Sequence, residues 1–104
     1  MLITLDLIDH DRCHTGLDLA LTVVAFEQAL DIVFVDSSIP AKHLDHTLSP
    51  AYQDKLAMLT DMGLKRICVY GINTNEIAPQ HDVIQLSKDD FRSIVQQHVS
   101  SVSF

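Results

Sequence analysis

Cys13 lies in a stretch whose residue types could do chemistry. His10, Arg12 and His14 flank it within three positions. A thiol acts as a nucleophile in its thiolate form, which positive charges and the exposed amides of a helix N-terminus both stabilise. If Cys13 lies just before the first turn of a helix, both conditions are met. The pattern then indicates a nucleophile or a persulfide carrier, although a polar loop residue without a role fits the same pattern.

His10, Cys13 and His14 could also act as metal ligands. Their spacing fits no zinc signature, and no second C-x-x-C or H-x-x-x-H occurs elsewhere to complete a site. His43 and His46 belong to a different expected loop and would have to converge in space on the first group. We therefore expect no bound metal.

The other chemistry-bearing residues have structural interpretations. Cys68 stands between Ile67 and Val69 in an apolar run, where a cysteine acts as a small buried hydrophobe. Four aspartates near the ends of the first two expected strands are interpreted as solvated side chains: Asp6, Asp9, Asp11 and Asp36.

Strands and helices alternate along the chain and must position these residues. Thr15–Asp18 has the form of a capping box, so we expect the first helix to begin there. Apolar residues surround most of this helix, which predicts burial against a sheet and against a second surface. The full set of expected elements is a strand at 2–8, a helix from Thr15, a strand at 31–36, a helix from Ser49-Pro50 to Gly63, strands at 67–70 and 82–86, a helix from the Ser87–Asp90 capping box, and a last strand within 99–104.

This alternation predicts one α/β domain over residues 1–104, with three α/β/α layers and a mainly parallel sheet of about five strands. Ligands of open α/β sheets bind where loops leave the carboxyl ends of the strands. Three loops qualify: 9–14, 37–48 and 71–80. None of them contains a G-x-G-x-x-G or a G-x-x-x-x-G-K-[ST] motif, so we expect no nucleotide cofactor.

The composition restricts partners and compartment. The net charge is −7, and the seven Lys and Arg residues are scattered, which argues against direct nucleic-acid binding. The sequence shows no basic signal-peptide region and no apolar run near the ~18 residues that span a bilayer. Two cysteines form no disulfide framework. We expect a cytoplasmic protein with reduced thiols and no membrane contact.

The chain resembles the DsrE/DsrF sulfur-relay family, and within it the DsrF/TusC branch, over nearly its full length. Three stretches carry the resemblance: "TGLDLALTVVAFEQALDIVFVDSSI", "SPAYQDKLAMLTDMGLKRICVY" and "SKDDFRSIVQQHVSSVSF". They are hydrophobic patterns that include a helix entry, a helix-to-strand passage and an alternating C-terminal strand closed by an aromatic residue. The chain departs from the family at Asp36–Ile39, where a glycine often follows the second strand.

The resemblance implies a DsrEFH-like fold and a place in a heterohexamer with TusB/DsrH-like and TusD/DsrE-like subunits. Such a complex receives persulfide sulfur from sulfur-carrier proteins and passes it toward 2-thiolation of the tRNA wobble uridine or toward sulfur oxidation. The sulfur-accepting cysteine of the D-type subunits follows the third strand, but residues 71–78 of this chain hold no cysteine, which fits a C-type subunit. The expected function is therefore that of a non-catalytic structural subunit. The alternative is a persulfide-accepting subunit that uses Cys13.

Overall fold

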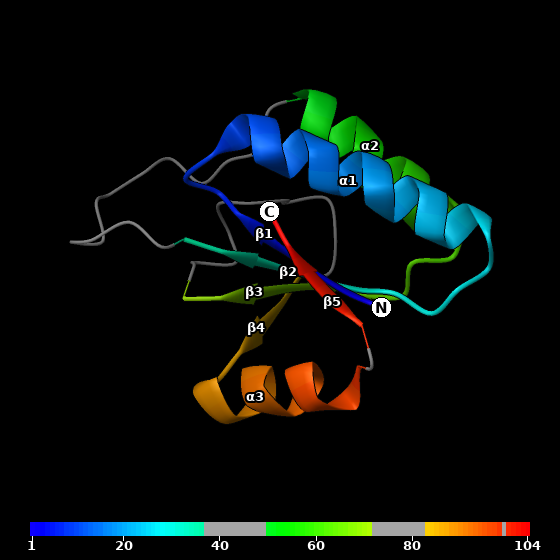
Figure 1. Cartoon of the computed structure of the whole chain (residues 1–104). Coiled ribbons are helices and arrows are strands. Elements are labelled where there is room, and N and C mark those ends of the chain that lie inside the picture. The colour runs from blue at the N-terminus through cyan, green and yellow to red at the C-terminus, as the bar shows by residue number, and fades with distance from the viewer. Residues whose placement is uncertain (37–49, 72–82, 99) are drawn as a thin grey trace.

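The computed structural model of the chain describes residues 1–36, 50–71, 83–98 and 100–104, with only the backbone of His10 (Figure 1). The predicted loops at 37–48 and 72–80, with His43 and His46, lie outside these residues. The described residues form one five-stranded sheet in the order β4-β3-β2-β1-β5, with every pairing parallel. The strands are β1 (Leu2–Asp6), β2 (Asp31–Val35), β3 (Ile67–Tyr70), β4 (Val83–Leu86) and β5 (Ser101–Ser103).

In the described part of the chain, three helices cover the two faces of the sheet. They are α1 (His10–Ala25), α2 (Pro50–Asp61) and α3 (Lys88–Gln97). Figure 1 shows α1 and α2 side by side over one face and α3 alone under the other. The predicted three-layer α/β/α class with a parallel sheet is thereby confirmed.

The strand register builds a larger core beneath α1 and α2. Ile3 of β1 lies beside Ile32 of β2, which lies beside Ile67 of β3. The next inward row brings Leu5 beside Phe34. Side chains in a strand alternate between the faces, so these rows pack on the same side. Buried residues of both helices complete this core: Cys13, Leu17, Ala20, Tyr52, Leu56 and Leu59.

A smaller core lies between the sheet and α3. Leu2, Val33 and Cys68 project from this face, and Ile94 of α3 packs against the group. Ser87 begins α3 with the predicted capping box, in which its hydroxyl accepts from the Asp90 amide at 3.1 Å. Cys68 is completely buried, as its place in an apolar run predicts.

Two side-chain predictions are wrong. The apolar spacing of residues 52–62 predicts that Met62 faces inward, but α2 already ends at Asp61 and Met62 is exposed. The spacing of Phe91, Ile94 and Val95 predicts that all three face inward, but Val95 is exposed, and Phe91 and Ile94 pack against the smaller core. The first helix packs on the sheet and on a second surface, α2, as its apolar residues predict, but Phe26 at its C-cap is exposed. Its apolar breadth is only partly explained by its packing on both β1 and α2.

Gly16 sets how closely α1 approaches the sheet. A Cβ atom at this position would overlap the Leu5 side chain and would lie 2.9 Å from the Phe104 ring. Phe104 is itself fixed beside β1, because its amide donates to the carbonyl oxygen of Thr4 at 2.8 Å. A residue with a side chain at position 16 would therefore push the helix away from β1 and from the C-terminal segment.

Candidate functional site

The helix that carries Cys13 begins earlier than the sequence analysis predicts. Asp9 is the N-cap residue of α1, and its carboxylate accepts from the Arg12 amide at 3.1 Å. The expected capping box at Thr15–Asp18 is wrong: the Thr15 hydroxyl donates to the Asp11 carbonyl oxygen at 3.2 Å, inside the helix. Cys13 therefore lies within the first turns of α1 and not in a loop.

This placement turns the Cys13 side chain into the core. Cys13 is 0% exposed, and its thiol donates to the carbonyl oxygen of Asp6 at 2.9 Å. The pKa of the Cys13 thiol is raised to about 11, mainly by burial. The negative charges of Asp6 and Asp9 also raise this pKa, and the positive charge of Arg12 offsets only part of their effect. The thiol stays protonated at neutral pH, which is the opposite of the state that a nucleophile needs.

His14 and Tyr52 lie over the same region, at the carboxyl edge of the sheet. Their rings stack with centroids 3.9 Å apart, and the Lys55 ammonium donates to His14 Nδ1 at 3.2 Å. An ammonium can only donate, so His14 Nδ1 is the accepting atom in this contact. Lys55 also pairs with the Asp18 carboxylate at 2.8 Å. These contacts join α1 to α2 beside the thiol.

Tyr52 shares the buried cluster of Cys13 and is 1% exposed. Burial raises the pKa of the Tyr52 hydroxyl to about 12, and the negative charge that Cys13 would carry as a thiolate raises it as well. Neither group ionises near neutral pH. Cys13 and Tyr52 can therefore pack and donate hydrogen bonds, but neither offers a ready nucleophile.

Cys68 lies on the opposite face of the sheet from Cys13. It is completely buried, and its burial raises the pKa of its thiol. Across the described parts of the chain, no three His, Cys, Asp or Glu side chains gather closely enough to hold a metal ion. The aspartates at this edge have local roles: Asp9 caps α1, and a carboxylate oxygen of Asp6 accepts from the Ile8 amide at 3.1 Å.

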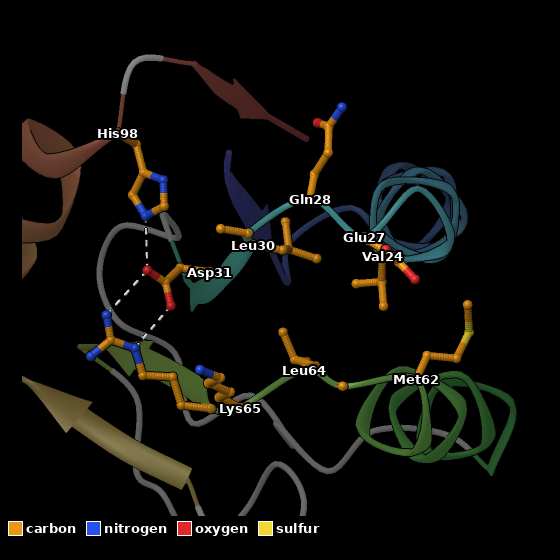
Figure 2. A pocket seen from close by; sticks show the side chains of 12 residues that line it. Val24, Glu27, Gln28, Leu30, Asp31, Met62, Leu64, Lys65 and His98 are labelled. Carbon is orange, nitrogen blue, oxygen red and sulfur yellow. Dashed lines mark hydrogen bonds and ion pairs between the residues drawn. The ribbon is translucent and has the colours of Figure 1, made fainter.

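A polar cluster that no sequence motif reveals lies at the other edge of the sheet, where the strands begin. Asp31 starts β2, and Arg66 immediately precedes β3. The guanidinium donates to both oxygens of the carboxylate, from Nε at 2.8 Å and from Nη2 at 3.1 Å. His98, at the end of α3, lies 2.8 Å from Asp31 through Nε2 (Figure 2). The hydrogen bonds from Arg66, above all, lower the pKa of Asp31.

A groove of about 640 Å³ lies beside this cluster. One wall runs along residues 24–31 and the other along residues 62–66, as Figure 2 shows.

No protein-family model matches this chain, and no curated protein matches it either. The family expected from the sequence therefore stays a prediction.

None of the helices in the described part of the chain is both long enough and apolar enough to cross a membrane.

The described residues offer two places for function. One is the shielded thiol region at the carboxyl edge, and the other is the groove at the amino edge. One signal could have revealed the second place: Asp31 and Arg66 carry opposite charges at the starts of two consecutive buried strands.

Proposed function

We propose that this chain is a non-catalytic structural subunit of a cytoplasmic sulfur-relay complex of the DsrE/DsrF type. It assembles with TusB/DsrH-like and TusD/DsrE-like subunits, and a cysteine of a partner carries the persulfide. The sulfur then goes toward 2-thiolation of the tRNA wobble uridine or toward sulfur oxidation. The sequence resemblance and the parallel five-stranded sheet support this proposal.

The burial of both thiols is the observation that carries the non-catalytic role. The chain has two cysteines, and both are 0% exposed. A persulfide carrier must receive sulfur from one protein and deliver it to another, so its cysteine has to be reachable and easily ionised. Cys13 has the opposite properties, because its thiol is covered and its pKa is raised to about 11.

Exposed apolar side chains support a role in assembly. They occur on several elements, so more than one partner could be contacted at once. The exposed large apolar residues that the structure describes are Ile8, Phe26, Met58, Met62, Ile84 and Val95. A stable contact of ordinary size buries about 800 Å² on each partner.

Native mass spectrometry of the chain, expressed with and without B- and D-type partners, tests the assembly. A defined hetero-oligomer that contains all three chains is expected. A chain that ignores both partners would overturn the proposal.

Sulfur transfer by the assembled complex then separates the two roles of this chain. Cys13→Ser is expected to leave both assembly and transfer normal, since serine keeps a donor near the Asp6 carbonyl oxygen. Loss of transfer with assembly preserved would favour the alternative, in which Cys13 accepts the persulfide. Cys68→Ser is the matched control for a buried thiol on the other face of the sheet.

A further inference from the structure

The end of α1 presents an aromatic and an acidic side chain to solvent. Phe26 is the C-cap residue and is 74% exposed, the largest exposed fraction among the large apolar residues that the structure describes. Glu27 follows it and is exposed as well. A single exposed apolar residue is common, so Phe26 alone does not indicate a contact surface.

Glu27 occupies a backbone position that suits glycine. Its φ is 58°, in the left-handed region. The amide of Glu27 donates to Val24 at 2.9 Å and that of Gln28 donates to Val23 at 3.3 Å, which is the Schellman pattern of a helix end. A side chain at this left-handed position is strained.

The charge of Glu27 is unfavourable for the helix too. A carboxylate at a helix C-terminus faces the negative end of the helix dipole, and the last turn of α1 has no basic residue to offset it. Glu27 thus opposes the stability of this helix end in two independent ways. A strained residue that persists in a fold points to a role outside the fold.

The groove beside Glu27 has the complementary features on its other wall. Val24 and Leu30 face it from the wall that carries Glu27, and Leu64 faces it from the opposite wall (Figure 2). Lys65 is exposed on that opposite wall. Neither Glu27 nor Lys65 takes part in an ion pair among the described residues.

We propose that this groove is the contact surface between two copies of this chain, related by a two-fold axis. In such a contact the same patch is used twice, so residue i meets residue j and residue j meets residue i. Phe26 of each copy packs into the groove of the other, and each Glu27 faces Lys65 of the other copy. Glu27 lies on one wall and Lys65 on the other, so one surface carries both partners of the ion pair. This charge complementarity favours a second copy of the chain over an unrelated partner.

This contact also gives the two ion pairs a clear role. Each copy carries a net charge of −7, so two copies repel each other at a distance. Two Glu27–Lys65 pairs offset that repulsion where the surfaces meet and fix their register. The inference needs only this chain and does not rest on the proposed function, although an assembly with two copies of each subunit accommodates it.

Sedimentation equilibrium of the full chain over the micromolar range tests the inference. The wild type is expected to form dimers, and Phe26→Ala is expected to weaken the dimer more than about tenfold, as for a central aromatic of an interface. Ile8→Ala is the matched control, because Ile8 is 56% exposed but lies at the other edge of the sheet. A monomeric wild type, or equal effects of the two substitutions, would overturn the proposal.

Charge reversal tests the register of the contact. Glu27→Lys places two lysines opposite each other, and Lys65→Glu places two glutamates opposite each other, so each variant alone is expected to be monomeric. An equimolar mixture of the two variants restores both opposite-charge pairs and is expected to dimerise. Circular dichroism of each variant establishes that it is folded. A mixture that remains monomeric while both variants are folded contradicts the Glu27–Lys65 pairing and overturns the inference.

Discussion

The guanidinium of Arg66 donates two hydrogen bonds to the carboxylate of Asp31, at 2.8 and 3.1 Å. The pair ties the beginning of β3 to the beginning of β2. His98 adds a third contact to the same carboxylate from the end of α3, across 67 positions of sequence. Three elements thus meet at one charged side chain beside the groove.

Replacing Arg66 with methionine should destabilise the fold at neutral pH by about 1 kcal/mol. The arginine side chain is 39% exposed, so solvent screening limits the value of the pair. The folded-state pKa of Asp31 is lowered from its ordinary 3.8. The pair therefore contributes fully above pH 3.8 and loses its contribution as the pH falls through the folded-state pKa.

Urea unfolding of the wild type and of Arg66→Met, at neutral pH and again well below pH 3.8, measures this effect. The difference in unfolding free energy between the two proteins should shrink in acid. Arg92→Met is the control, because Arg92 is exposed on α3, and it should change stability by less than about 0.5 kcal/mol. A difference that is the same at both pH values would mean that Asp31 ionisation is not involved.

The two possible starts of α1 make opposite predictions about capping. Asp9→Ala should cost about 1 kcal/mol of unfolding free energy because it removes the acceptor for the Arg12 amide, whereas Asp9→Asn should cost little. Thr15→Ala should change stability by less than about 0.5 kcal/mol, since Thr15 lies inside the helix. Thermal or urea unfolding distinguishes the two starts. A larger loss of stability for Thr15→Ala than for Asp9→Ala would indicate that the helix starts at Thr15.

Local signals predicted the elements whose determinants are local. The Ser87–Asp90 capping box starts α3 as expected, because both of its hydrogen bonds lie within four residues. The apolar run after Asp31 predicts β2 because a strand buried on both faces needs no polar alternation. Local pattern and tertiary structure agree in both segments.

The start of α1 depends on a contact that the local pattern does not contain. Asp9 and Thr15 are both acceptable N-cap residues by type. Gly16 is helical from either start, but only the start at Asp9 puts Cys13 in the helix and turns its side chain into the core. The missing side chain of Gly16 lets this helix approach Leu5 and Phe104. The partners of Gly16 lie far away in sequence, so the choice between the two caps could not be made from residues 9–18 alone. The burial of Cys13 follows from the same choice.

Thiol reactivity tests the shielding of Cys13 directly. In the folded chain, its pKa of about 11 in place of 9.0 lowers the thiolate fraction near neutral pH about 100-fold, before burial restricts access further. Ellman's reagent should therefore react with neither cysteine at an appreciable rate until the protein is unfolded. In denaturant both thiols should react.

The single variants Cys13→Ser and Cys68→Ser assign any reaction that is seen. Both should show one slow thiol in the folded state and one fast thiol in denaturant. Rapid labelling of Cys13 in the folded protein would contradict its shielding and would support its role as a persulfide acceptor.

Glu27→Gly should raise the stability of the monomer by about 0.5–1 kcal/mol, because glycine adopts the left-handed φ of 58° without strain and removes a carboxylate from the negative end of α1. Glu27→Gln removes the charge but keeps the strain, so it should recover only the smaller, electrostatic part of the gain. Gln28→Gly is the control at the next position, where φ is not positive, and it should not stabilise the fold. Urea unfolding at concentrations below dimerisation measures all three. If Glu27→Gly destabilised the monomer, the Glu27 side chain would be stabilising the fold of its own chain. The strain at this position would then no longer support a contact with a second copy.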